Sequence, residues 1–310
     1  MAPFLPFRTC AIALVLVSLG GCASTRNRAS DVRGEEAVHL RTDVFSGHRY
    51  VADADLGLGR PVPLMIHGNA RMFLMVTHEI GERLNGGPVP KVADYGYSAK
   101  GKGVIRVARL RFGRREIRDL RDVPVFDYLP EGHGPAQGMV GVPFLIAERA
   151  AVDFSRDQMI LGVPVSALPD RALLDRGYRS VAMTVDPSGK MAIQAYFPAL
   201  DRTLSITPST VSTALTLHRP PFAGKVPMTR DTTDTDHSPS GTNPELFHAD
   251  RVSFVIAGTR FTTPASLEDF AEYANVPESE LGSLGLLGFD WMKDHGAILD
   301  YANRFFYFRP

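Results

Sequence analysis

The sequence predicts an all-β protein built from two similar lobes. Short runs of β-branched and aromatic residues recur along the chain, each bounded by Gly, Pro, Asn or Asp. A long segment near the middle of the chain also recurs, without a gap, near its end. The clearest predicted strands are residues 64–66, 72–76, 104–112, 193–196 and 252–256. Helical patterns are few and short: 80–84, 143–149, 266–273 with Ser266 as N-cap, and 290–296.

The internal repeat is the strongest evidence for two lobes. The segment GMVGVPFLIAERAAVDF begins at Gly138, and GLLGFDWMKDHGAILDY begins at Gly285. Upstream, residues 104–113 align with 251–258, and residues 74–77 align with 204–207. Matches in the same order predict a duplicated lobe, with the first copy over 41–168 and the second over 169–310. The second copy carries an insertion, 229–245, whose Thr, Asp, Ser and Pro content predicts a mobile surface loop.

The N-terminal residues are typical of an export signal. Arg8 precedes an apolar run over 10–19, which is too short to span a bilayer and ends in Leu19-Gly20-Gly21-Cys22. This ending resembles the bacterial lipobox, and the resemblance implies a signal peptide over 1–21 and a lipid on Cys22. Ala23 then implies an outer-membrane lipoprotein that faces the periplasm. The alternative is an ordinary secretory signal.

Composition limits the remaining possibilities. Residues 22–40 are polar and aperiodic, which predicts a flexible tether. The only two cysteines are Cys10 and Cys22, so the mature body has no disulfide, thiolate metal site or cysteine nucleophile. The net charge is near zero, which argues against a nucleic-acid partner. Arginines alternate with apolar residues over 106–121, a pattern typical of a solvated outer strand face.

Each copy resembles one lobe of a retropepsin-like aspartic protease. The resemblance rests on Gly138-Met139-Val140-Gly141, on Gly285-Leu286-Leu287-Gly288, and on the strand-turn-strand pattern of residues 63–76. It implies a bilobal, pepsin-like fold over 41–310, with an inter-lobe cleft that binds an extended peptide. In that family two Asp carboxylates share a proton and activate a water molecule. Fused lobes need no dimerisation, so a monomer is plausible, although the oligomeric state stays open.

The chain departs from the family at both Asp-Thr-Gly positions. The first lobe has Thr77-His78-Glu79 there, and the second has Thr207-Pro208-Ser209. No Asp occurs between Pro61 and Lys91, or between Asp201 and Asp231. A threonine hydroxyl does not ionise near neutral pH, so the sequence predicts no catalytic residue at either position. Paired threonines would still allow hydrogen bonds between the lobes. The predicted cleft residues are Thr77, His78, Glu79, Tyr95, Tyr97, Thr207 and Ser209.

Other chemistries have weaker support. A zinc-protease helix needs H-E-x-x-H, but Glu82 stands where the second His is required. A mixed metal site of His67, His78, Glu79 and Glu82, or a weak cation site in the 229–245 insertion at Asp234, Asp236 and His237, is less favoured than a solvated surface. Ser209 lacks a G-x-S-x-G elbow. We therefore expect no metal and no cofactor. The C-terminal aromatic residues, Tyr301 and 305–308, are expected in the core.

These observations predict a membrane-anchored, catalytically degenerate protein that binds a peptide or protein partner in the cell envelope. One alternative is an active hydrolase that uses Glu79 with a water molecule or a metal. The other is a purely structural envelope protein with a closed cleft.

Overall fold

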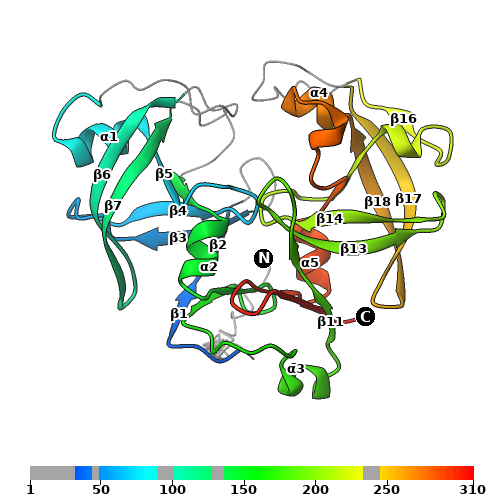
Figure 1. Cartoon of the computed structure of the whole chain (residues 1–310), viewed down its shortest axis with the longest axis horizontal. Helices are drawn as coiled ribbons and strands as arrows, with labels where there is room; N and C mark the ends of the chain where they lie inside the picture. Colours follow the sequence, from blue (N-terminus) through cyan, green and yellow to red (C-terminus); the bar gives the residue numbers. More distant parts are fainter. Residues whose placement is uncertain (1–31, 44–48, 90–100, 127–135, 233–244) are drawn as a thin grey trace, which may run out of the picture.

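A computed structural model describes residues 32–43, 49–89, 101–126, 136–232 and 245–310. Their strands form three sheets. Two of the sheets belong to separate lobes, and the third lies between the lobes and joins them (Figure 1). The predicted all-β, bilobal architecture is confirmed, and the helices are few and short.

The first lobe is a seven-stranded sheet in the order β2-β3-β4-β8-β5-β7-β6. Its strands are β2 (Arg41–Asp43), β3 (Arg49–Ala54), β4 (Val62–Ile66), β5 (Leu74–Thr77), β6 (Gly101–Phe112), β7 (Arg115–Phe126) and β8 (Gly138–Val140). Its helices are α1 (His78–Asn85) and α2 (Val142–Ala147). Strand β8 lies between β4, to which it is parallel, and β5, to which it is antiparallel. The segment that joins β4 to β5 forms hydrogen bonds with the other lobe.

The second lobe repeats this plan in an eight-stranded sheet, β12-β13-β14-β19-β15-β18-β17-β16. Its strands are β12 (Thr184–Val185), β13 (Met191–Phe197), β14 (Arg202–Pro208), β15 (Leu215–His218), β16 (Thr229–Arg230), β17 (Phe247–Ile256), β18 (Thr259–Glu268) and β19 (Gly285–Leu287). Its helical segments are η1 (Pro220–Phe222), α4 (Phe270–Ala274), η2 (Glu278–Glu280) and α5 (Phe289–Asp294). Strand β19 lies between β14 (parallel) and β15 (antiparallel), as β8 does in the first lobe.

A six-stranded sheet, β1-β10-β9-β20-β21-β11, joins the lobes. Its strands are β1 (Glu36–His39), β9 (Ala151–Asp153), β10 (Gln158–Leu161), β11 (Arg179–Ala182), β20 (Ile298–Asp300) and β21 (Phe305–Phe308), and α3 (Arg171–Asp175) precedes β11. At its centre β9 of the first lobe pairs with β20 of the second, with Val152 opposite Leu299. The sequence-based prediction did not include this sheet.

The repeat around Gly138 and Gly285 is confirmed at the level of single elements. In each copy the glycine begins a short strand, β8 or β19, which leads into a short helix, α2 or α5. The hairpins β6/β7 and β17/β18 are likewise equivalent. Gly141 and Gly288 cap the two helices, and a Cβ on either would lie within 2.5 Å of backbone carbonyl oxygens. These glycines therefore permit a close backbone approach.

Aromatic side chains form much of the core and also join the lobes. Tyr50 from β3 contacts Phe154 and Phe289, with ring centroids 5.1 and 4.7 Å away. Phe289 belongs to α5, so this cluster crosses from one lobe to the other. In the second lobe Trp291 packs 5.0 Å from Phe261 in an edge-to-face arrangement. The expectation that the C-terminal aromatic residues are core residues is confirmed for Tyr301 and 306–308, which are buried, whereas Phe305 is half-buried.

The structure differs from three local predictions at residues that it describes. The tether predicted for 22–40 is already a strand at Glu36–His39, because this polar segment pairs with the apolar strand β10. Ser266 lies in β18, and Asp269 instead caps α4 by accepting hydrogen bonds from Ala271 N and Glu272 N at 3.0 and 3.2 Å. The insertion predicted over 229–245 begins as strand β16, paired with β17. Residues 233–244 and the signal peptide, 1–21, lie outside the described residues.

The arginines of β6 and β7 form a solvated face, as predicted, and acidic side chains oppose them. Arg109 and Arg111 both contact Asp55, at 2.9 and 2.7 Å. A hydrogen bond from Gly57 N, followed by those from Arg111 and Arg109, lowers the pKa of Asp55. Exposed pairs of this kind contribute little to stability. Within the described ranges, no helix is long and apolar enough to cross a bilayer.

Candidate functional site

Two equivalent turns meet between the lobes, and we call them together the seam: residues 67–70, which follow β4, and residues 209–212, which follow β14. His67 N donates to Val140 O at 2.9 Å, and Ser209 N donates to Leu287 O at 2.8 Å. Because Val140 and Leu287 are equivalent in the repeat, His67 and Ser209 are equivalent too. The next contacts agree, since Ala70 O and Ser212 O accept from the first residues of α2 and α5.

This equivalence corrects the predicted positions of Thr77 and Thr207. Thr207 belongs to β14, whose counterpart is β4, whereas Thr77 ends β5, whose counterpart is β15. The two threonines are therefore not related by the repeat. Both β4 and β5 are short and apolar, so the pattern alone did not show which of them matches β14. Thr207 is fully buried, and its hydroxyl donates to Ser283 Oγ at 2.9 Å within its own lobe.

Hydrogen bonds across the seam join the lobes. Gly68 N donates to Thr210 Oγ1 at 2.8 Å, and Thr210 Oγ1 donates to Ile66 O at 2.6 Å. A single buried hydroxyl thus satisfies a donor and an acceptor of the opposite lobe. The sequence predicted that two equivalent threonines join the lobes by hydrogen bonds. Only Thr210 does so, because the equivalent residue of the first lobe is Gly68, which has no hydroxyl.

Gly68 is required by close packing. A Cβ at this position would lie 2.5 Å from Tyr301 Oη. Tyr301 is fully buried below the seam, and burial raises the pKa of its phenol. Burial thus favours the neutral phenol over the phenolate.

A second inter-lobe hydrogen bond links Asn69 to Ser209. Asn69 Nδ2 donates to Ser209 Oγ at 3.0 Å, and Ser212 N donates to the same oxygen at 3.1 Å. Ser209 is fully buried, so its hydroxyl serves as an acceptor within the turn rather than as an exposed nucleophile. His67 Nδ1 accepts from Asn69 N at 3.2 Å. Asn69 Oδ1 is buried and has no hydrogen-bond partner among the described residues.

His67 carries the only side chain in the two turns of the seam that can ionise near neutral pH. Neither turn contains Asp or Glu, and correcting the register does not change this. An aspartic-protease mechanism needs two carboxylates that share a proton. The groups present can donate and accept hydrogen bonds, but they cannot supply that pair.

His78 and Glu79 lie on α1, and their charged neighbours are outside the seam. His78 Nε2 lies 3.2 Å from Glu82 Oε1, one helical turn along. Glu79 has a side chain that is 65% exposed and lies 3.6 Å from Arg60. No group of three or more His, Cys, Asp or Glu side chains is placed to hold a metal in the described part of the chain. The mixed site that would combine His67 with α1 is therefore not brought together.

Several predicted residues lie outside the described ranges. They are Cys22, Tyr95, Tyr97, Asp234, Asp236 and His237.

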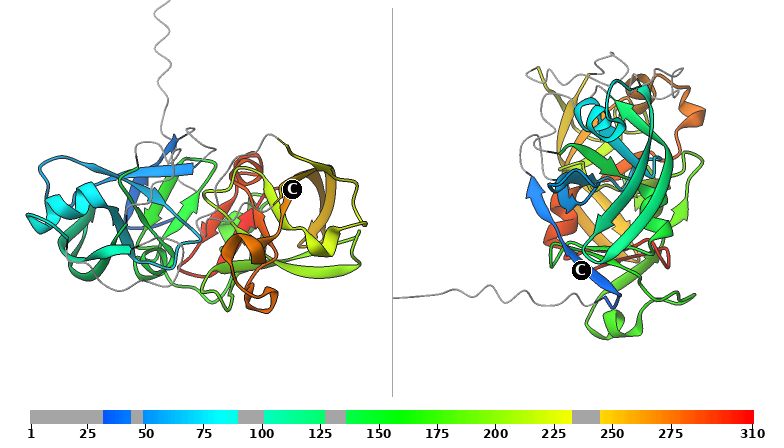
Figure 2. Two further views of the ribbon diagram at one scale, coloured as in Figure 1. Left: turned by 90° about the horizontal axis from the view of Figure 1, so that it is seen from above. Right: turned by 90° about the vertical axis from the view of Figure 1, so that its left-hand side faces the viewer.

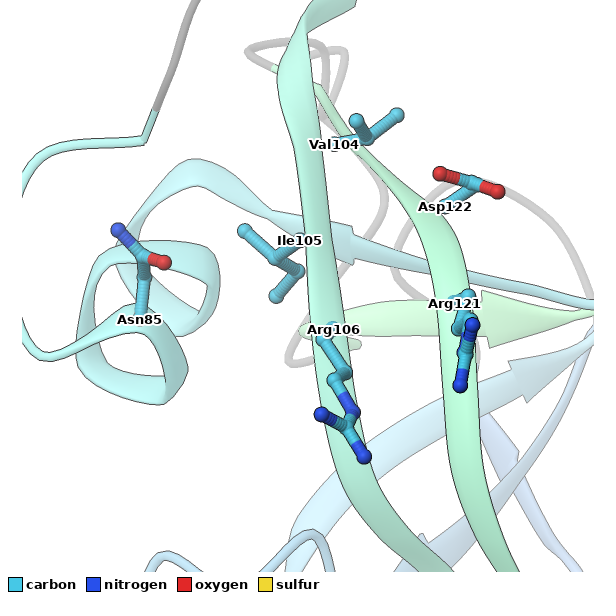
Figure 3. A pocket seen from close by; sticks show the side chains of 6 residues that line it. All are labelled: Asn85, Val104, Ile105, Arg106, Arg121 and Asp122. Carbon is cyan, nitrogen blue, oxygen red and sulfur yellow. The ribbon is translucent and has the colours of Figure 1, made fainter.

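A hollow lies away from the seam, between α1 and the β6/β7 hairpin (Figure 3). Its volume is about 450 Å³, and Arg106 and Arg121 line it from neighbouring strands. Both arginines pair with Asp119, and they lower the pKa of its carboxyl, Arg106 most. The charges of this hollow therefore neutralise one another, and it offers no evident ligand chemistry.

Ser209 was predicted as a site residue from the sequence. That His67, Gly68, Asn69 and Thr210 lie together with it was not predicted. The usable signal was the Gly68-Asn69 turn directly after the apolar run 64–66, which places a tight turn between two buried strands.

Comparisons with solved structures agree with this architecture. The backbone is similar to the aspartic proteinase from Irpex lacteus, with a TM-score of 0.51 and 12% identity over 88% of this chain and 96% of that one. It is also similar to basic 7S globulin from soybean, with a TM-score of 0.49 and 10% identity over 88% of this chain and 94% of that one. No family model and no curated protein matches the sequence. At such low identity the likeness shows the fold alone, and that fold is aspartic-proteinase-like.

Proposed function

We propose that this protein is a membrane-anchored, aspartic-proteinase-like scaffold without proteolytic activity, which binds a peptide or protein partner at the seam in the cell envelope. The observation that carries the proposal is the replacement of a carboxylate pair by His67 and Ser209 at equivalent positions of the two turns. A serine hydroxyl does not ionise near neutral pH, so it cannot replace a carboxylate as a shared base. The lipobox-like sequence at Cys22 supports the anchor and the placement at the outer membrane, facing the periplasm.

The binding role rests on Asn69. Its Nδ2 is used by Ser209, whereas its buried Oδ1 lacks a partner among the described residues. A buried polar group without a partner costs free energy, and a ligand that supplies a donor removes that cost. The backbone N–H of an extended peptide is such a donor.

A pair of matched variants tests this role. Peptides are first selected from a random twelve-residue library on the immobilised full-length mature protein, and their Kd values are measured by fluorescence anisotropy. Asn69→Leu removes the acceptor at similar side-chain volume, so we expect affinity to fall about 5- to 10-fold, the worth of one hydrogen bond. Thr262→Val is the control, because it removes an exposed hydroxyl on β18 and leaves the seam unchanged, so Kd should stay within about 2-fold.

The outcomes separate a ligand contact from a structural one. Equal affinity of Asn69→Leu and wild type would place the ligand elsewhere. Equal losses in both variants would mean that the loss does not arise from a contact between Asn69 and the ligand. A thermal melt of each variant identifies any loss that arises from unfolding.

A further inference from the structure

The segment between the lobes exposes two large apolar side chains close together. Val165 and Leu168 are each 73% exposed, more than any other large hydrophobic side chain described. All residues over 164–168 are exposed, and we call this segment the 164–168 loop. Isolated exposed apolar residues are common, whereas two such side chains on one loop give a small exposed apolar patch.

Hydrogen bonds hold the loop in this conformation. Asn303 Oδ1 accepts from Ser166 N at 2.6 Å, and Asn303 Nδ2 donates to Pro164 O at 3.1 Å. Within the loop, Ser166 Oγ donates to Leu168 O at 2.8 Å. Asn303 is itself fixed by Asp300, whose carboxylate accepts from Asn303 N and Nδ2 at 3.0 and 2.8 Å. The polar groups are thus satisfied internally, and the apolar side chains are left facing outward.

The N-terminal segment joins the body beside this loop. Val32 packs in a buried cluster that includes Val163, directly before the loop, and Leu173 of α3. Figures 1 and 2 show α3 and the start of β1 at the same end of the molecule, opposite α1 and α4. Cys22 precedes Val32 by ten residues, which span at most about 35 Å when fully extended. A lipid on Cys22 therefore keeps Val32, and this end of the body, within about 35 Å of the bilayer.

We infer that the 164–168 loop rests in the headgroup layer of the membrane to which Cys22 is anchored, with Val165 and Leu168 inserted. This inference rests on the lipid anchor of the proposed function. It also orients the molecule: β4 and β14, which lead into the seam, lie across the six-stranded sheet from α3, so the seam faces away from the bilayer (Figure 1).

Charge has a minor role in this contact. Residues 163–180 contain Arg171, Arg176 and Arg179 against Asp170 and Asp175, a net charge of only +1. An electrostatically held surface would need a cluster of basic residues. Within this segment, the contact therefore depends on apolar insertion more than on charge.

Single-cysteine labelling tests the inference, because the mature body has no cysteine apart from Cys22. Val165→Cys and Leu168→Cys are labelled with an environment-sensitive fluorophore on the full lipidated chain, in vesicles of phosphatidylethanolamine and phosphatidylglycerol. Tyr273→Cys, on α4 at the opposite end, is the matched control. We expect blue-shifted emission and at least two-fold stronger quenching by nitroxide lipids at 165 and 168 than at 273.

Flotation of the vesicles separates the two claims. If the protein floats with the vesicles but positions 165 and 168 are quenched no more than 273, the loop inference fails while the anchor stands. If labels at 165 and 168 are shielded from both aqueous iodide and nitroxide lipids, a protein partner covers the loop and the inference also fails. If the protein does not float, the anchor itself is wrong, and the inference falls with it.

Discussion

Gly288→Ala is expected to destabilise the protein by about 3 kcal/mol or more. The new Cβ would lie 2.2 Å from Ala214 O and 2.4 Å from Thr213 O. Both are backbone atoms, so no side chain can rotate to relieve the clash. Gly288 also directly precedes Phe289, whose N–H donates to Ser212 O at 2.6 Å. The substitution should therefore displace the second turn of the seam as well as α5.

Urea unfolding of wild type and variant measures the effect. Gly87→Ala is the matched control, since a Cβ at Gly87 meets no atom within 4 Å and its φ is not in the left-handed region. We expect the control to change the free energy of unfolding by no more than about 0.5 kcal/mol. A Gly288→Ala variant within about 1 kcal/mol of wild type would contradict the close approach of α5 to this turn.

Thr210→Val is expected to cost about 2–4 kcal/mol, although the side chain keeps its shape. The substitution leaves Gly68 N and Ile66 O unpaired in a buried environment, where water cannot replace the hydroxyl. The loss arises from two unsatisfied backbone groups and not from a cavity. Because both groups belong to the opposite lobe, the variant should also weaken the association of the lobes.

Two further variants isolate this effect. Thr210→Ser retains the hydroxyl and should recover most of the stability of wild type. Thr262→Val removes a hydroxyl that bonds Ser253 Oγ at 2.8 Å on an exposed strand face, and should cost no more than about 0.5 kcal/mol. If Thr210→Val and Thr262→Val unfold at the same urea concentration, Thr210 does not join the lobes.

The sequence predicted the two lobes because the repeat preserves glycines at positions where two backbone segments approach closely. Gly138, Gly141, Gly285 and Gly288 have counterparts because a side chain at each would collide with a neighbouring strand or turn. The alternating hairpins were predictable for the same local reason. The six-stranded sheet was not predictable, since its edge strand β1 has a polar sequence and pairs with β10 far along the chain. Such pairing depends on tertiary contacts that no local pattern records.

The sequence shows that the candidate site lacks a pair of Asp residues, but it does not show which residues of the two lobes are equivalent. The absence of Asp from both strand-turn-strand segments is a property of the sequence alone. Which residues replace the pair depends on whether β4 or β5 matches β14, and only the pairing of β8 and β19 decides this. Thr77 was therefore assigned to a position that His67 occupies. The unpartnered Asn69 Oδ1 follows from three-dimensional packing and has no signal in the sequence.

We propose that the seam does not cleave peptide bonds, and a proteome-wide cleavage assay tests this proposal most directly. The full lipidated chain in detergent is incubated with denatured proteins from pH 3 to pH 8, with and without a chelator, and new N-termini are identified by mass spectrometry. His67→Ala, Ser209→Ala and Glu79→Gln are assayed in parallel. We predict no cleavage above background under any condition, because neither turn supplies a carboxylate. Cleavage by wild type that is lost in any of these variants, or on chelation, would contradict the account.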